Sequence, residues 1–149
     1  MFVCVCVFEH ISGPALRFSR ARARALSRST RTLSYIAGVG SRLDNTLLEE
    51  LPSLLGKLVK LRGFSAVQNK LVNLPEEFGK MVSLTKINLD SNGLRSLPES
   101  LGNLKNLRDI SLTRNRIGWL PGSIRNLAKV EEMRLSFNRH KFSKTTLYK

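Results

Sequence analysis

The sequence contains few of the side chains that catalytic and metal sites require. Its 149 residues include two cysteines, Cys4 and Cys6, and two histidines, His10 and His140. One Cys-x-Cys pair cannot supply a disulfide framework, and a single nearby histidine does not complete a metal-ligand set. No Ser/His/Asp set, paired carboxylates or phosphate loop has the spacing that catalysis requires. The sequence therefore predicts no enzymatic activity, no cofactor and no metal site.

Acidic residues and long hydrophobic runs are scarce in the first part of the chain. The apolar opening, Met1 to Phe8, is too short to span a bilayer, so no transmembrane segment is predicted. Residues 1–42 contain seven arginines and one acidic residue, Glu9, in a chain of net charge +14. This Arg/Ser-rich leader is predicted to be disordered or to act in targeting. Its composition resembles that of an organellar transit peptide, while a disordered basic arm, an incorrectly assigned start and a secretory signal remain alternatives.

The leader also leaves a second class of function open. Arginines can neutralise phosphates, so the arm would suit a basic protein associated with nucleic acid or with a membrane surface. Aromatic residues are not interleaved with the arginines, and a solvated basic run is the commoner outcome. Nucleic acid is therefore not the predicted partner.

An internal repeat dominates the rest of the chain. Four asparagines stand 23 residues apart, and each follows the same apolar spacing. The repeat units begin at four Leu-Pro pairs. These asparagines are Asn69, Asn92, Asn115 and Asn138, and the units begin at Leu51, Leu74, Leu97 and Leu120. Self-similarity at a fixed period of this length is the signature of a solenoid.

The repeated phrase resembles the leucine-rich repeat. The pattern Leu84-x-x-Ile87-x-Leu89-x-x-Asn92-x-Leu94 carries the resemblance. It implies an α/β solenoid of about four repeats, with short parallel strands on the concave side and helical or 3-10 turns on the convex side. We assign residues 43–142 to the repeats and residues 143–149 to a polar tail.

The spacing itself supports these elements. Apolar residues that alternate with period two, such as Ile110 and Leu112, predict a short strand with one buried face. Apolar residues at intervals of three after each Leu-Pro predict a helical or 3-10 turn. An asparagine side chain both donates and accepts hydrogen bonds, so the four asparagines are predicted to form a ladder that links neighbouring coils.

The two ends of the repeat region depart from the pattern. Upstream, Leu43 and Leu48 match the repeat while Thr46 takes the asparagine position, which predicts half a unit that serves as a partial cap. Downstream, His140 replaces an apolar residue and no amphipathic capping helix follows. Terminal repeats need a polar outer face, so we expect either a partner on the last coil or, as the favoured alternative, a longer solenoid.

Strand residues that flank the buried pair are predicted to point to the concave face, the usual contact surface of a solenoid. We expect Lys86 to lie beside Asp109, and Asp90 to lie diagonal to Arg114. Trp119 is expected to stack on Pro121 or on an adjacent loop, and Phe137 to pack against a missing fifth repeat if it does not contact a partner. The predicted binding residues are Lys86, Asn88, Asp90, Asp109, Ser111, Arg114, Glu132, Arg134 and Phe137.

Within the superfamily, the regular 23-residue unit with Leu-Pro at its start resembles the intracellular Ras-suppressor, Shoc-like and plant Ras-group-related proteins. This resemblance implies a non-enzymatic signalling adaptor that binds a small GTPase or a phosphatase complex, as a monomer or as part of a longer solenoid. Extracellular members usually cap the first coil with disulfides, which this chain lacks near its repeats. We therefore expect a cytoplasmic location, or a mitochondrion or plastid if the leader is a transit peptide. The recognition region of a larger signalling enzyme is a further alternative.

Overall fold

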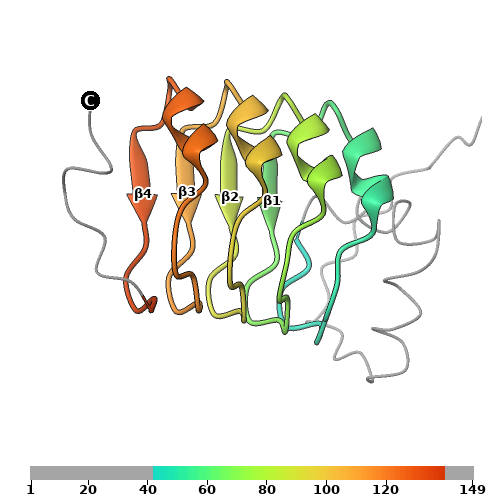
Figure 1. Ribbon diagram of the computed structural model, residues 1–149. Coiled ribbons are helices and arrows are strands. Elements are labelled where there is room, and N and C mark those ends of the chain that lie inside the picture. The colour runs from blue at the N-terminus through green and yellow to red at the C-terminus, as the bar shows by residue number, and fades with distance from the viewer. Residues whose placement is uncertain (1–41, 140–149) are drawn as a thin grey trace, which may run out of the picture.

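The computed structural model describes residues 42–139, which form a row of stacked coils with strands on one side and short helices on the other (Figure 1). The expectations for the leader up to Ser41, for His140 and for the polar tail lie outside the described residues. The strands are β1 (Gly63–Ser65), β2 (Lys86–Asn88), β3 (Asp109–Ser111) and β4 (Glu132–Arg134). The 3-10 helices are η1 (Ser53–Lys57), η2 (Glu76–Lys80), η3 (Glu99–Asn103) and η4 (Gly122–Asn126).

The strands form one parallel sheet in the order β1-β2-β3-β4. Their register follows the repeat, since Lys86 pairs with Asp109 and Asp109 pairs with Glu132. An isolated parallel bridge between Arg42 and Ser65 extends this order by one position toward the N-terminus. The predicted α/β solenoid with parallel strands and 3-10 turns is confirmed.

Leucines at equivalent positions fill the space between the strands and the 3-10 helices. Ile110 and Leu112 are each 2% exposed, as their alternation predicts, and Leu104 and Leu107 are fully buried. Side chains of this kind contribute about 1.5–3 kcal/mol each when buried. Each coil therefore completes its core only where a neighbouring coil covers it.

Proline and glycine fix the geometry of the convex side. Each 3-10 helix follows a proline in extended conformation, such as Pro98 with φ −69° and ψ 149°. Successive 3-10 helices approach so closely that a Cβ atom at Gly79 would lie 2.2 Å from the Ser100 carbonyl oxygen. A Cβ atom at Gly102 would lie 2.5 Å from the Ser123 carbonyl oxygen. Only glycine permits this spacing between coils.

The asparagine ladder forms as predicted. Asn115 donates from Nδ2 to the Leu89 and Leu112 carbonyl oxygens, at 2.9 and 3.0 Å. Its Oδ1 accepts a hydrogen bond from the Leu94 N–H at 3.1 Å. Asn138 repeats this pattern with the coil before it, donating to Leu112 O and accepting from the Ile117 N–H. The ladder thus satisfies backbone groups that the turn out of the sheet would leave unpaired.

The half unit before β1 closes one end of the core. Leu43 and Leu48 are each 1% exposed, and Thr46 is 4% exposed. The Thr46 hydroxyl lies 2.9 Å from both the Leu43 carbonyl oxygen and the Asn69 Oδ1. Among the described residues no earlier coil needs a hydrogen bond from this position, so the shorter threonine side chain suffices where later coils use asparagine.

Candidate binding face

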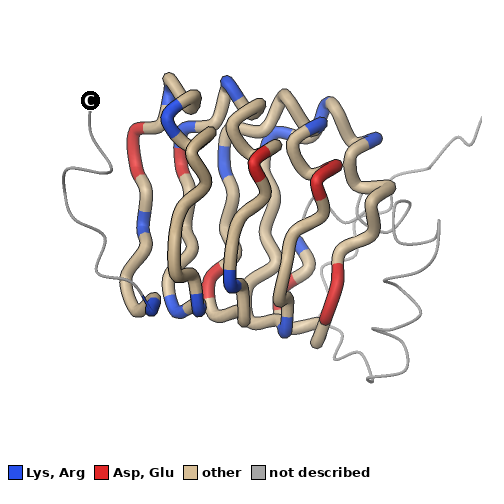
Figure 2. The backbone as a smooth tube through the Cα atoms, viewed as in Figure 1, with Lys and Arg blue, Asp and Glu red and all other residues tan. Residues whose placement is uncertain are grey.

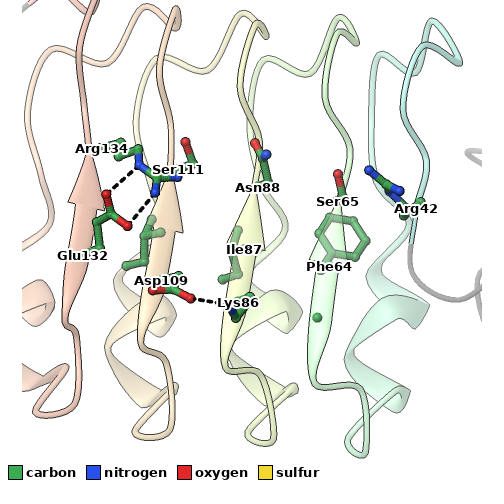
Figure 3. Close-up of a pocket in the computed structure, with 12 residues that line it drawn as sticks. Arg42, Phe64, Ser65, Lys86, Ile87, Asn88, Asp109, Ser111, Glu132 and Arg134 are labelled. Atoms are coloured by element: carbon green, nitrogen blue, oxygen red, sulfur yellow. Dashed lines mark hydrogen bonds and ion pairs between the residues drawn. The ribbon is translucent and has the colours of Figure 1, made fainter.

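A shallow groove of about 520 Å³ crosses the concave side of the sheet. Side chains from β1 to β4 line it in two rows that run across the strands (Figure 3). Neighbouring strands in a sheet are about 4.8 Å apart, so members of a row lie side by side. The first row is Gly63, Lys86, Asp109 and Glu132, and the second is Arg42, Ser65, Asn88, Ser111 and Arg134.

Residues of both charge signs occur over the described coils (Figure 2). In the first row, Lys86 Nζ lies 2.9 Å from Asp109 Oδ2, which confirms the predicted neighbours. The hydrogen bond to Asp109, together with the charge of this carboxylate, raises the pKa of the Lys86 amine. The Lys86 side chain remains 72% exposed and stays accessible to a partner.

Glu132 and Arg134 form the second ion pair of the groove. Both residues belong to β4 and both side chains point to the concave side (Figure 3). Arg134 Nε donates to Glu132 Oε1 at 2.7 Å, and its Nη2 donates to Oε2. The two side chains are 57% and 51% exposed. Asp109 and Glu132 are neighbours in register, so Glu132 has a like charge on the adjacent strand. The opposite charge of Arg134 lies two residues further along its own strand.

Asp90 and Ser111, two of the predicted binding residues, make hydrogen bonds within the fold. Within residues 42–139, no ion pair joins Asp90 to Arg114. Asp90 instead accepts hydrogen bonds from the Ser111 hydroxyl at 2.7 Å and from the Thr113 N–H at 2.7 Å. Ser111 is consequently 5% exposed, and its hydroxyl is committed to the fold. Asp90 and Ser111 thus connect two adjacent coils.

The same device occurs at the start of the described chain. Asp44 accepts hydrogen bonds from the Ser65 hydroxyl at 2.6 Å and from the Val67 N–H at 2.8 Å. Asp44 and Asp90, which stand two repeats apart, therefore each link their coil to the following one. Asn88 lies between Ser65 and Ser111 in the second row. It accepts a hydrogen bond from the Asp90 N–H and is partly exposed in the groove.

Arg114 and Phe137 lie beyond the strands, at equivalent positions in adjacent coils. The Arg114 guanidinium carbon lies 5.7 Å from the centre of the Phe137 ring, within the range of a cation–π contact. Both residues have a φ of 57°, and Phe137 is 76% exposed. A bulky residue in this conformation carries backbone strain. Arginine therefore stabilises an aromatic side chain that the core does not cover.

Trp119 and Arg42 stand outside the four strands. Trp119 is 67% exposed, and its stacking on Pro121 or an adjacent loop stays a prediction. Arg42 was assigned to the leader, yet it pairs with Ser65 and lines the groove. The signal was available, because Arg42 precedes Ser65 by one repeat length. The half unit contains threonine at the asparagine position, so the asparagine spacing alone does not extend the repeat to Arg42.

The described part of the chain offers no cluster of three or more histidine, cysteine, aspartate or glutamate side chains that could hold a metal ion. None of the helices within residues 42–139 has the length and apolar character needed to cross a membrane. The groove itself is lined by hydrogen-bonding groups and by charged groups of both signs. Such a surface can contact a polar macromolecular partner.

Comparison with known proteins agrees with this architecture. Residues 82–139 match the family described as leucine rich repeat. No curated protein matches the sequence. A leucine-rich repeat protein of Leptospira interrogans is 38% identical, with a TM-score of 0.68, and the match covers 70% of this chain and 26% of that one. The chain thus spans about a quarter of that protein's length.

Two further solved structures are similar. The leucine-rich repeat domain of the type III effector XopL is 27% identical with a TM-score of 0.60, over 68% of this chain and 39% of that one. The plant peptide hormone receptor RGFR1, solved in complex with RGF2, is 24% identical with a TM-score of 0.52, over 64% of this chain and 20% of that one. The likeness to RGFR1 concerns the fold alone. Residues 42–139 therefore form a leucine-rich repeat solenoid, a fold that generally serves protein interaction and is typically a non-enzymatic scaffold.

Proposed function

We propose that this protein is a non-enzymatic adaptor that binds a protein partner through the concave groove. The observation that carries the proposal is a set of charged side chains in the groove. They remain exposed and take no part in the core. Lys86, Glu132 and Arg134 are each more than half exposed. Concave solenoid surfaces are the usual binding surfaces of repeat proteins.

The burial pattern reduces the predicted contact set to a smaller one. Asp90 and Ser111 serve the fold, so we exclude them. Arg42 joins the set because it lines the N-terminal end of the groove. Arg114 and Phe137 extend the set beyond the strands, and exposed aromatic and arginine side chains are the types that most often dominate binding energy. The proposed contact residues are Arg42, Lys86, Asn88, Asp109, Arg114, Glu132, Arg134 and Phe137.

The charges indicate the chemistry of the partner. The groove carries lysine and arginine beside aspartate and glutamate, so a complementary surface also carries both signs. A folded protein surface meets this requirement. From the Ras-group resemblance we propose a small GTPase or a phosphatase complex in the cytoplasm, with signalling as the role. The resemblance alone supports this finer assignment.

An exchange of charges within the groove tests the proposal. The full chain is used as bait in native lysate, and captured proteins are purified and titrated against the full chain. The test variant exchanges Lys86→Asp with Asp109→Lys, which retains an ion pair and the net charge but inverts the pattern that a partner meets. The matched control exchanges Arg108→Glu with Glu131→Arg, an exposed pair with a 2.7 Å contact outside the groove lining.

We expect the wild type and the control to bind one protein with similar affinity. The Lys86/Asp109 exchange should weaken that binding about tenfold or more, which corresponds to about 1.4 kcal/mol. Circular dichroism verifies that both variants fold. Equal affinity of the two exchanged variants would show that the groove does not contact the partner.

A further inference from the structure

We infer that the free edge of β4 is a self-association site that pairs with a second copy of this chain in antiparallel orientation. The inference concerns the C-terminal end of the solenoid and goes beyond the concave groove. It begins with the apolar side chains that remain uncovered there. Met133 and Leu135 are partly exposed, whereas the equivalent Ile110 and Leu112 of the preceding coil are each 2% exposed.

Within residues 42–139, backbone N–H groups in and after β4 have no partner along the same edge. The Leu112 and Arg114 N–H groups each donate to the next coil at 2.9 Å, to Arg134 O and Ser136 O. The equivalent N–H groups in the last described coil belong to Leu135 and Phe137. Backbone groups alternate in direction along a strand, so the Met133 N–H points to the same edge. An exposed strand edge of this kind is a template for pairing with another chain.

A fifth coil stacked like the others does not fit this edge. Close stacking requires glycine at Gly56, Gly79 and Gly102, where a Cβ atom would lie 2.2–2.7 Å from a carbonyl oxygen of the next coil. Arg125 stands at this position in the last described coil. Its own Cβ atom would collide with a coil stacked in the same geometry, which favours a different strand arrangement at this edge.

Antiparallel pairing with a second copy meets the requirements of charge and hydrogen bonding. With a two-fold axis at Met133, the two Met133 residues exchange N–H to carbonyl hydrogen bonds, as directly opposed residues do in an antiparallel pair. Glu132 then lies opposite Arg134 of the second copy, and Arg134 opposite Glu132. In each copy, the Glu132 and Arg134 side chains already form an ion pair within β4, and both point to the concave face. The result is a ring of four alternating charges that only a self-complementary strand can form.

Charge reversal at these two positions tests the pairing. The full chain and three variants, Glu132→Arg, Arg134→Glu and the double exchange, are compared by sedimentation velocity over a range of concentrations. The wild type should show a monomer–dimer equilibrium. Either single reversal places like charges opposite each other twice per dimer, and should weaken dimerisation about tenfold or more. The double exchange restores opposite charges and should return dimerisation to near the wild-type level.

Several outcomes would overturn the inference. A wild-type chain that is monomeric at every concentration would show that the edge does not pair with a second copy. Dimerisation that neither single reversal weakens would place the contact elsewhere. Oligomers that grow beyond the dimer would indicate head-to-tail stacking, since a two-fold contact closes at two copies. Both positions are exposed, so the variants should fold, and circular dichroism verifies this.

Discussion

The two ends of the solenoid solve the same problem differently. At the N-terminal end, a half unit of a few residues buries Leu43 and Leu48 to 1% exposure. At the C-terminal end, a complete coil leaves Met133 and Leu135 partly exposed, although they occupy regular repeat positions. Burial in a solenoid is thus decided by what lies beyond a coil more than by the coil's own sequence.

Polar groups show the same asymmetry. Thr46 returns its hydroxyl to the Leu43 carbonyl oxygen and so completes the ladder within the half unit. Glu76 and Glu99 each accept hydrogen bonds from the first residues of the next 3-10 helix, such as the Gly122 and Ser123 N–H groups at 3.2 and 3.1 Å from Glu99. Gly122 stands at the equivalent position in the last described coil, so this chain of caps stops there.

The largest expected effect comes from truncating equivalent leucines at the two ends. Leu43 and Leu135 occupy the same repeat position, but only Leu43 is fully covered. Leu43→Ala should lower the free energy of unfolding by about 2–5 kcal/mol, because a cavity remains in a packed core. Leu135→Ala should cost about 1 kcal/mol, because its environment is already partly solvated. Urea denaturation at a concentration where the protein is monomeric measures both.

Equal losses at Leu43 and Leu135 would remove the distinction between the ends. They would show that Leu135 is covered in solution by a segment or partner. Repeating the measurement at high protein concentration then separates the two sources, since a second copy stabilises only when it is bound.

Removal of two equivalent asparagines should give an intermediate effect. Asn115 is 7% exposed, whereas Asn138 is partly exposed and makes the same type of bonds. Asn115→Ala leaves the Leu94 N–H without its partner inside the solenoid, and should destabilise by about 1–3 kcal/mol. The Leu89 and Leu112 carbonyl oxygens keep the hydrogen bonds from Asn92 and Asn138. Asn138→Ala should cost less, because water can reach the groups that it leaves. Thermal denaturation followed by circular dichroism compares them, and a larger loss for Asn138 would contradict the role of burial.

The smallest expected effect concerns the convex caps. Hydrogen bonding from Ser123 and Gly122 lowers the pKa of the Glu99 carboxyl below its ordinary value of 4.5. The stabilisation is therefore complete above pH 4.5 and is lost as the pH falls through the lowered pKa. Glu99→Gln should melt slightly below the wild type at pH 7, and the difference should vanish in acid. Gly122→Glu, the matched control, should not change stability with pH, because no described coil follows it.

The sequence predicted most of the fold because the repeat places equivalent residues in equivalent environments. The asparagine spacing predicted the strand register, the ladder and the neighbouring positions of Lys86 and Asp109. These features depend on the chain's own period. Every interior coil meets a neighbour of nearly the same shape.

The candidate site was predictable only in part. Position in the repeat correctly identified which residues face the concave side, but it did not reveal which side chains the fold itself uses. Asp90 was expected diagonal to Arg114, and its carboxylate accepts hydrogen bonds from Ser111 and Thr113 in that same coil. The short aspartate side chain reaches these groups directly, and a committed hydrogen bond removes Ser111 from the surface. Arg114 then contacts Phe137 instead.

The sequence by itself determined the solenoid, since a 23-residue period of leucines and asparagines has one way to bury its apolar face in stacked coils. The tertiary structure alone decided which polar side chains remain available to a partner. It also decided that, within residues 42–139, the N-terminal end of the core is covered more fully than the C-terminal end. The physical reason is that periodicity fixes the direction of a side chain, whereas exposure and hydrogen bonding depend on the neighbours that the folded coils bring to it.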